Sequence, residues 1–174
     1  MFRPTQLLRS AFAAALACTA ALFAGCSSDP VAFDVKITVD KALEGTAMQV
    51  DIFGVNKTVE LPKWEAFPIA DYWQPGNTSR RDLDRHTLTF GRKLPTTQTF
   101  PASDPKWSNW LTAGAVSAVV IADIPGVAGS GTSDPRRLIL PLLKSDWDRD
   151  DSDAPLEIRI KESGLILVTR RTQK

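Results

Sequence analysis

Residues 115–124 read Ala-Val-Ser-Ala-Val-Val-Ile-Ala-Asp-Ile, a run that is nearly continuous in apolar side chains and rich in Val and Ile. Continuous apolar runs of this kind are typical of strands buried on both faces, whereas half-buried strands alternate. We therefore predict that this segment is the central strand of the fold and that the rest of the chain is arranged around it.

The runs that flank this segment are shorter, and most of them alternate between apolar and polar side chains. We predict strands at 33–39, 48–52, 86–90, 138–143, 156–160 and 165–168. The period of two indicates one buried and one solvated face, so Gln49 and Asp51 are expected to point to solvent. The first two strands are expected to pair as a hairpin across residues 40–46, and the last two as a terminal hairpin around Ser163 and Gly164.

Proline, glycine and charge mark the connections between these strands. Pro141 cannot donate to a β-ladder, so strand 138–143 is predicted to lie at a sheet edge or to bulge there. Residues 125–135 hold three glycines and two prolines without periodicity, which predicts an exposed, mobile loop. The charged run 80–85 is expected to be a solvated loop or helical turn.

Aromatic side chains interrupt the strand pattern between residues 61 and 73, where the sequence has Trp64, Phe67, Tyr72 and Trp73. Pro62 can occupy the first position of a short helix, and Pro68 must end or kink it at Phe67. The segment is therefore predicted to form two short helical turns laid over a sheet, with its aromatic side chains packed in the core.

Trp107 and Trp110 are three residues apart, which places them on one side of a further helical turn. Two interpretations of Trp107, Trp110 and Trp147 stay open at this stage. They pack in the core, or they are exposed and serve a protein interface, where tryptophan is enriched among the residues that matter most for binding.

About seven short strands with Gly- and Pro-containing turns favour a mainly β fold. We predict an antiparallel β-sandwich of the transthyretin or immunoglobulin kind, with short helical insertions, as one domain over residues 33–174. A domain of this length buries enough surface to be stable with a single hydrophobic core.

The amino-terminal residues have the pattern of a bacterial lipoprotein signal. Arg3 and Arg9 precede an apolar stretch at 11–23, which leads into Leu-Phe-Ala-Gly-Cys at 22–26. A basic start, a short apolar core and small residues at the cleavage point are the parts of a secretory signal, and the cysteine offers its thiol for acylation. We expect residues 1–25 to be the signal peptide, with cleavage after Gly25, and residues 26–32 to be a tether acylated at Cys26.

The alternative, an uncleaved transmembrane anchor, requires about 20 apolar residues, and this stretch is shorter. Ser27 and Ser28 follow Cys26, and by resemblance to enterobacterial sorting rules the lack of Asp there favours the outer membrane. The protein is therefore expected to face the periplasm from that membrane, held by its acyl chains.

Charge and cysteine content narrow the classes of partner. The whole chain carries 21 basic and 20 acidic side chains, and loss of Arg3 and Arg9 leaves 19 against 20, a net charge of −1. This balance gives no basis for a nucleic-acid partner. Cys18 is lost with the signal and Cys26 is used for lipid, so no disulfide is expected.

The segment 146–153 is the one candidate ion site. Asp146, Asp148 and Asp150, followed by Glu157 at the twelfth position counted from Asp146, are spaced as in an EF-hand loop, whose oxygen ligands suit calcium. Asp151 stands where the loop's sharp turn needs glycine, so we interpret the cluster as solvated charge and assign no metal and no cofactor.

Catalytic patterns are weak. His86 is the single histidine and is expected to be a strand residue at a sheet margin, and the glycines near residue 129 lack the spacing of a phosphate-binding loop. We therefore do not expect an enzyme.

The order of these features resembles the TssJ family, outer-membrane lipoproteins of the type VI secretion system. The resemblance rests on the Cys26 lipobox, the first alternating strand, Val-Asp-Ile-Phe at 50–53, the aromatic insertion, Ala-Val-Ser-Ala-Val-Val at 115–120, an Arg-initiated strand and the terminal hairpin. It departs from the family's pattern at 50–55, where a Val-Arg-Ile-Tyr-Gln-Leu kind of run is usual, and in its short loop after the first strand.

The resemblance implies a transthyretin-like β-sandwich with an added helical piece, tethered by acyl chains. It also implies that the loop after the first strand contacts the periplasmic end of the inner-membrane subunit TssM. In this sequence that loop consists of Asp40, Lys41, Ala42, Leu43, Glu44, Gly45 and Thr46.

Three functions are carried forward. The first is a lipid-anchored lipoprotein that docks a periplasmic assembly at the outer membrane, with the secretion-system component as its concrete form. The second is an envelope lipoprotein that binds calcium or another ligand. The third is a cell-wall hydrolase, which would need two carboxyl groups about 5–9.5 Å apart in a cleft.

Overall fold

The computed structural model describes residues 29–56, 59–151 and 153–173. The predicted signal peptide at 1–25, its cleavage after Gly25 and the acylation of Cys26 lie outside the described residues. None of the helices within these ranges has the length and apolar character needed to cross a membrane.

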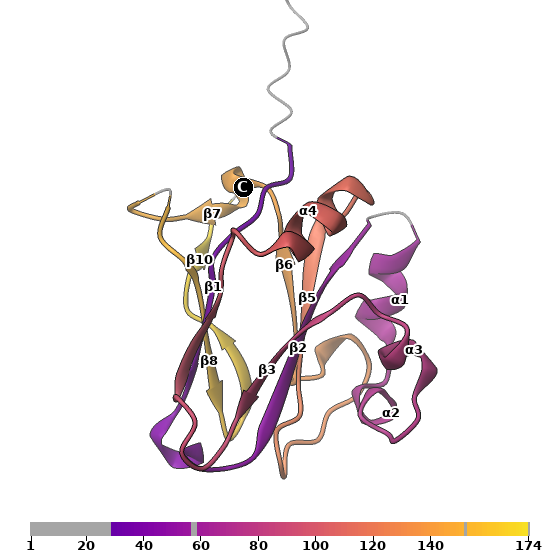
Figure 1. Ribbon diagram of the computed structural model, residues 1–174, viewed down its shortest axis with the longest axis vertical. Coiled ribbons are helices and arrows are strands. Elements are labelled where there is room, and N and C mark those ends of the chain that lie inside the picture. The colour runs from indigo at the N-terminus through magenta and orange to yellow at the C-terminus, as the bar shows by residue number, and fades with distance from the viewer. Residues whose placement is uncertain (1–28, 57–58, 152, 174) are drawn as a thin grey trace, which may run out of the picture.

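Two four-stranded sheets pack face to face, which confirms the predicted β-sandwich (Figure 1). The first sheet has the strand order β4 (Thr97–Phe100), β1 (Val35–Val39), β8 (Leu156–Lys161) and β9 (Gly164–Leu167). The second sheet has the order β3 (His86–Phe90), β2 (Met48–Val55), β5 (Ser117–Ala122) and β6 (Arg137–Pro141). A small ribbon pairs β7 (Trp147–Asp148) with β10 (Arg170–Arg171).

The strands lie where the apolar pattern predicts their buried faces. In β1, Val35 and Ile37 are fully buried between the sheets, and the alternate side chains, Lys36 and Thr38, are half-buried. All six residues of β5 are buried, and the strand lies between β2 and β6, as predicted for the central strand. Strand β6 is an edge of its sheet, as predicted from Pro141, and β8 and β9 form the predicted terminal hairpin.

The predicted hairpin between the first two strands is wrong, because β1 and β2 belong to different sheets. Strand β1 pairs antiparallel with β4 and parallel with β8, so both of its hydrogen-bonding edges are occupied. The first sheet is therefore mixed, and the connection after β1 crosses from one layer to the other. The sequence pattern also predicts fewer strands than the structure contains. One that it misses is β4, which lies in a Pro- and Thr-rich stretch without a clear alternating pattern.

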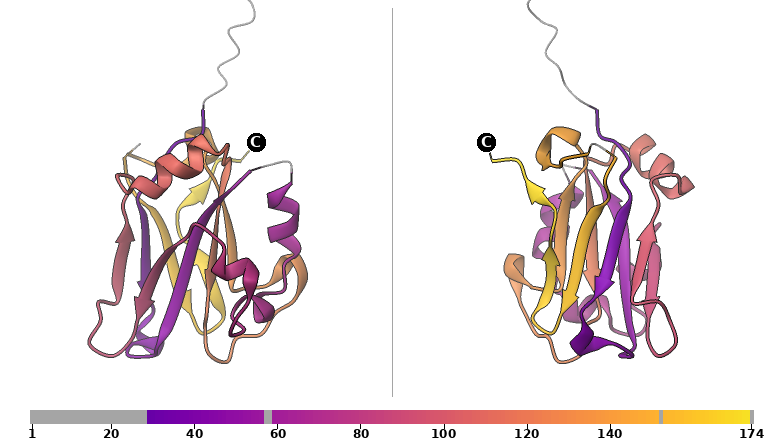
Figure 2. Two further views of the ribbon diagram at one scale, coloured as in Figure 1. Left: turned by 45° about the vertical axis from the view of Figure 1, so that its right-hand side comes forward. Right: turned by 90° about the vertical axis from the view of Figure 1, so that its left-hand side faces the viewer.

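Three short helices cover the outer face of the second sheet (Figure 2). They are α1 (Glu60–Ala66), α2 (Ile69–Tyr72) and α3 (Thr78–Arg81). The predicted break falls at Phe67, whose extended backbone at ψ 130° separates α1 from α2. Trp64 packs against Phe53 of β2 with ring centroids 4.7 Å apart, which fixes this layer to the sheet through apolar contacts.

A fourth helix, α4 (Pro105–Thr112), closes one end of the sandwich. Pro105 is its first residue and the Asp104 side chain accepts a 2.9 Å hydrogen bond from the Lys106 amide, which is a favoured helix start. The helix packs so closely on β2 that a Cβ at Gly54 would lie 2.5 Å from Trp110 Cβ.

The two ends of the sandwich differ (Figure 1). The described chain enters beside α4 and β7, and we call this the N-terminal end. The opposite end, which we call the loop end, carries the connections 40–47, 91–96 and 162–163, together with the long connection from β5 to β6. That connection contains η2 (Gly131–Ser133), and η3 (Lys144–Asp146) precedes β7 at the N-terminal end.

Candidate functional site

The predicted partner-binding loop, residues 40–46, lies at the loop end of the sandwich and forms a single 3-10 turn, η1 (Lys41–Leu43). The Asp40 amide donates to the Ile160 carbonyl at 2.9 Å, which extends the β1–β8 ladder up to the start of the turn. The Asp40 side chain accepts from the Ala42 amide, and Gly45, at φ +79°, ends the turn. The loop is thus a compact turn held at both ends.

Only one side chain of this turn is directed into the protein. Leu43 is buried, whereas Lys41, Ala42 and Glu44 are exposed. Three of the seven predicted residues therefore offer their side chains fully to a protein that approaches the loop end.

The connection from β3 to β4, residues 91–96, lies beside this turn. The two segments line a shallow hollow with a volume of about 10 Å³, which is far below the 300–1,000 Å³ of typical ligand pockets. Leu94 in this connection is 45% exposed, and Lys93 next to it adopts a left-handed backbone at φ 67°. The geometry suits contact with a protein surface better than binding of a small molecule.

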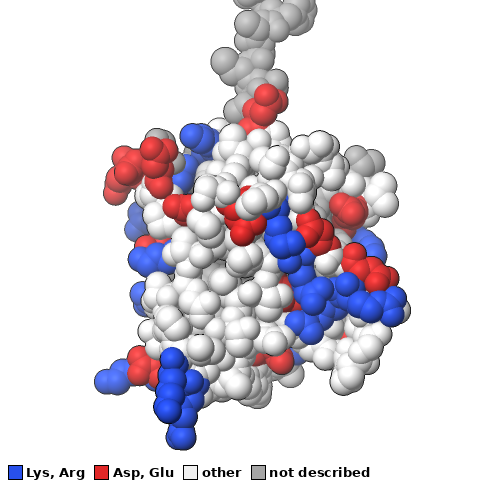
Figure 3. Space-filling view, viewed as in Figure 1, with Lys and Arg blue, Asp and Glu red and all other residues white. Residues whose placement is uncertain are grey.

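Basic side chains gather at this end. Figure 3 shows Lys and Arg together at the lower left, over η1 and the β3–β4 connection. The exposed basic residues of the loop end are Lys41, Arg92, Lys93 and Lys161. Exposed charges of this kind influence the rate and orientation of protein association more than they add affinity.

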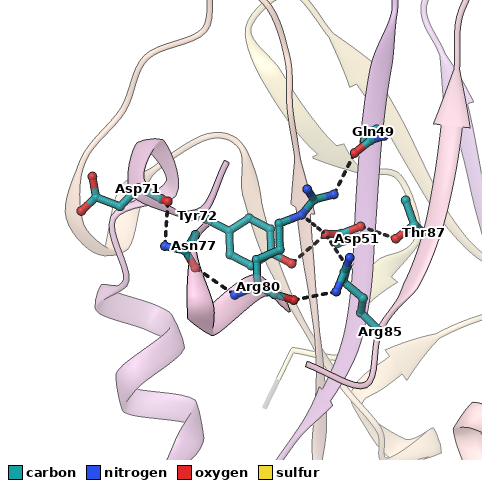
Figure 4. A network of polar contacts seen from close by, with 8 residues as sticks. All are labelled: Gln49, Asp51, Asp71, Tyr72, Asn77, Arg80, Arg85 and Thr87. Carbon is teal, nitrogen blue, oxygen red and sulfur yellow. Dashed lines mark hydrogen bonds and ion pairs between the residues drawn. The ribbon is translucent and has the colours of Figure 1, made fainter. Parts of the chain in front are cut away.

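A second polar cluster lies between the second sheet and its helical layer, centred on Asp51 of β2 (Figure 4). Tyr72 Oη donates to Asp51 Oδ2 at 2.8 Å, and Thr87 Oγ1 donates to Oδ1 at 2.6 Å. Arg80 Nε lies 2.8 Å and Arg85 Nε 3.1 Å from Oδ2. We call these five residues the Asp51 cluster.

The prediction for Asp51 is wrong, because this side chain is expected to face solvent and is fully buried. The run 80–85 includes the predicted helical turn, since α3 ends at Arg81, and three of its residues are exposed, but Arg80 and Arg85 pair with Asp51. The physical reason is that helices α1 to α3 cover this face, so a carboxylate on it must be paired. No local pattern distinguishes such an Asp from a solvated one.

The chemistry of the Asp51 cluster is structural. Burial, followed by the negative charge of Asp51, raises the pKa of the Tyr72 phenol, so Tyr72 stays protonated and continues to donate its hydrogen bond. Arg80 also donates to Gln49 Oε1 at 2.7 Å and stacks over Trp73, with 4.3 Å from its guanidinium carbon to the ring centroid. The Asp51 carboxylate is fully buried and pairs with two guanidinium groups, so it is not accessible to a substrate, and it fixes the helical layer to the sheet.

A second buried ion pair anchors the end of the connection from β5 to β6. Arg136 donates to both oxygens of Asp134, at 3.0 and 2.7 Å. Burial alone would raise the pKa of the Asp134 carboxyl, but the hydrogen bonds from Arg136 hold it below its ordinary value. Arg137 also donates to the Phe67 carbonyl at 2.8 Å, so the predicted loop 125–135 is exposed along most of its length but fastened to the helical layer at its end.

The four candidate metal ligands lie on separate elements. Asp146 ends η3, Asp148 belongs to β7, Asp150 follows it, and Glu157 lies in β8 with its carboxylate 2.9 Å from Lys36 Nζ. Over residues 29–56, 59–151 and 153–173, no three His, Cys, Asp or Glu side chains are grouped as a metal site would require.

His86 lies on the edge strand β3, as predicted. Its ring stacks on Phe100, with centroids 4.2 Å apart, and its Nδ1 is 3.6 Å from Asp104 Oδ2. Burial lowers the pKa of His86, while the negative charge of Asp104 opposes that shift.

The three tryptophans considered for an exposed interface are all buried. Trp107, Trp110 and Trp147 are 2%, 5% and 6% exposed, so the core interpretation is confirmed. Trp147 Nε1 donates to the Pro141 carbonyl at 3.0 Å, which joins β7 to the end of β6.

Comparison with known proteins gives likeness in structure only. No protein-family model and no curated protein matches the sequence. One similar solved structure is a "Type VI membrane complex", with 13% identity and a TM-score of 0.49, covering 79% of this chain and 98% of that one. A second is Lip of Serratia marcescens, described as a membrane-bound component of the type VI secretion system, with 13% identity, a TM-score of 0.48, and coverage of 83% and 98%.

A third is the type VI secretion lipoprotein TssJ1 from Pseudomonas aeruginosa, with 9% identity, a TM-score of 0.47, and coverage of 83% of this chain and 99% of that one. The likeness is one of fold.

Proposed function

We propose that this protein is a lipid-anchored envelope lipoprotein that docks a periplasmic assembly at the outer membrane. More specifically, the protein is a component of the type VI secretion membrane complex, and its partner is a TssM-like inner-membrane subunit. The acyl chains on Cys26 hold it in the membrane, and the loop 40–46 contacts the partner. It acts as a connector and carries out no catalysis.

The first support is the sequence before the sandwich. The basic start, the short apolar core and the Ala24-Gly25-Cys26 junction have the order that lipid modification of a secreted protein requires. Two or more acyl chains hold a protein stably in a bilayer, because each buried methylene contributes about 0.8 kcal/mol.

The observation that carries the proposal is the position of the loop 40–46 relative to the chain entry. The Val31 amide donates to the Leu142 carbonyl at 2.8 Å, which fastens the chain to the sandwich at the N-terminal end. Only four residues lie between Cys26 and Val31, and the five steps from Cys26 to Val31 span at most about 18 Å when fully extended. An anchor at Cys26 therefore keeps the N-terminal end close to the membrane and turns the loop end toward the periplasm.

The composition of the loop end supports a protein as the partner. Lys41, Ala42 and Glu44 of the turn and Leu94 beside it provide exposed charged and apolar side chains on two rigid connections. The order of elements along the sequence resembles the family whose corresponding loop contacts TssM, and this supports the choice of partner.

Lipid anchoring is tested on the native protein, extracted from membranes of the cell that makes it. Intact-mass analysis is expected to show a chain that begins at Cys26 and carries acyl chains, and fractionation is expected to place it in the outer membrane. An unmodified cysteine, or recovery of the chain from the cytosol, would refute the anchoring.

Docking is tested with the purified periplasmic domain of a type VI inner-membrane subunit from the same organism. Reversal of the exposed charges in K41E/E44K is expected to weaken its binding by about tenfold, mainly through a slower association rate that depends on salt concentration. The matched control is Ser108→Glu on α4, which is equally exposed but lies at the N-terminal end and should leave binding unchanged. Equal affinity of K41E/E44K and the unaltered protein would contradict a contact at this loop.

A further inference from the structure

We infer that β1 is a tension-bearing strap, because it runs through the sandwich directly from the membrane anchor to the partner-binding loop. This inference rests on the proposed function, since the anchor and the partner define the two points at which force enters the chain. Tension between the membrane and the partner would then pass along the covalent backbone of β1. The remaining strands would not be pulled apart.

The first observation is connectivity. The chain is fastened at the N-terminal end by the hydrogen bond of Val31 to Leu142, continues through β1, and reaches the loop end at Asp40. Asp40 is at once the residue that follows β1 and the residue that caps η1. Figure 1 shows β1 descending along the sandwich from the chain entry to η1, so the two points of attachment lie at opposite ends of one strand.

The second observation is that β1 itself is already extended. A residue in a strand spans about 3.2–3.4 Å, against a maximum of about 3.3–3.6 Å for any chain, so a strand pulled along its axis lengthens very little. The turn η1 can open further, since a 3-10 residue rises only about 2 Å, but it holds just three residues. The segment from Val35 to Leu43, which comprises β1 and η1, can therefore extend by only on the order of 10 Å.

The third observation is how β1 is held. It lies in the interior of its sheet, between β4 and β8, and the hydrogen bonds of Val39 to the Thr96 carbonyl and of Asp40 to the Ile160 carbonyl continue this pairing beyond the strand. Its apolar side chains at Val35 and Ile37 are fully buried. The neighbouring strands thus keep β1 straight and prevent the loaded segment from peeling away.

A partner bound to another connection at the loop end would load the fold differently. Force applied at the β8–β9 turn would have to cross from β1 to β8 through their hydrogen bonds and side-chain packing. These non-covalent contacts would then rupture, and the sandwich would open.

The test is single-molecule force spectroscopy on the mature lipidated protein in detergent micelles, with handles on introduced cysteines. In D29C/E44C the handles lie at the two ends of the β1 path, 15 residues apart (44 minus 29). In the matched control D29C/S163C one handle moves to the β8–β9 turn, also at the loop end, 134 residues from the other (163 minus 29). All three side chains are exposed, and A42C serves as a second position on η1.

The control is expected to unfold with a lengthening on the order of 400 Å. At the force that unfolds the control, β1 is expected to stay paired in its sheet in D29C/E44C and D29C/A42C, so thermolysin added under that load should not cut the chain between the two handles. Cleavage between the handles at or below that force would show that β1 leaves the sandwich, and it would overturn the inference.

The readout separates this inference from the proposed function. The force measurement needs neither partner nor membrane, so loss of partner binding in the docking test would leave its result intact. If intact mass shows an unmodified Cys26, the anchoring proposal fails, and the same measurement with Cys26→Ser added still reports on β1.

Discussion

Tyr72 of α2 donates a 2.8 Å hydrogen bond to the buried carboxylate of Asp51, and this contact joins the helical layer to the second sheet. The Asp51 carboxylate also accepts a hydrogen bond from Thr87 and forms ion pairs with two arginines. Four side chains that are distant from Asp51 in sequence thus converge on one carboxylate. Such a group is stable only when every partner is in place, because a buried charge that loses its partners keeps its desolvation cost.

Tyr72→Phe removes one donor from Asp51 and leaves the ring packing intact. A hydrogen bond to a charged group contributes about 1.5–3 kcal/mol, so urea denaturation should show a loss of that order in the free energy of unfolding. Asp51→Ala should cost more, about 3–5 kcal/mol, because it leaves Arg80 and Arg85 beside each other without their counter-ion. The control is Asp82→Ala, which breaks the fully exposed pair with Arg81 and should change nothing measurable. Equal effects at Asp51 and Asp82 would contradict the role given to the cluster.

Gly54→Ala should displace α4 from β2. The added Cβ would meet Trp110 Cβ at 2.5 Å, and overpacking of this kind typically costs about 1–3 kcal/mol. Gly91→Ala is the matched control, because its Cβ would find its nearest neighbour, Ala47 Cα, at 3.7 Å. Thermal unfolding should therefore separate the two variants, and a Gly54→Ala protein as stable as Gly91→Ala would argue against the close packing of α4.

His86 should make the stability fall as the solution is acidified below about pH 6.5. Burial lowers the pKa of His86 in the folded state, so below its ordinary pKa the unfolded chain binds the proton more readily and unfolding is favoured. His86 is the single histidine, so urea titrations between pH 7.5 and 5.5 report mainly on this group. His86→Phe keeps an aromatic ring against Phe100 and should flatten the profile. A variant with an unchanged pH dependence would show that another group is responsible.

Calcium should leave the melting temperature unchanged. Asp146, Asp148 and Glu157 lie on three different elements, and Glu157 is paired with Lys36, so the spacing that resembles an EF-hand loop does not gather these carboxylates around one point. Thermal denaturation in millimolar CaCl2 and in EDTA measures this directly, because a ligand that binds only the folded state raises its stability. A melting temperature that rises with calcium would favour the calcium-binding function.

Features that depend on neighbouring residues could be predicted from the sequence. The central strand at 115–124 follows from its unbroken apolar character, and the terminal hairpin around Gly164 follows from two alternating runs with a turn between them. The break between α1 and α2 follows from Pro68, because the residue before a proline avoids helical backbone. Each of these signals lies within a few residues of the structure that it predicts.

The pairing of β1 and the burial of Asp51 could not be predicted in this way. Two alternating strands joined by a short turn are compatible with a hairpin, and only the availability of β4 and β8, about 60 and 120 residues later, places β1 in the other sheet. The Asp51 side chain is solvated or buried according to whether a helical layer covers it, and the alternating pattern is the same in both cases.

The candidate site also has features that the local sequence predicts and features that only the tertiary structure determines. The residues of the proposed partner-binding loop and of the proposed acylation signal are local strings of sequence, so a local pattern is enough to predict them. The placement of that loop at the far end of the strand that begins near Cys26 comes from the tertiary structure alone. Local periodicity and turn chemistry act between adjacent residues, whereas the pairing of distant strands and the layer that covers each sheet follow from which apolar surfaces meet when the whole chain packs.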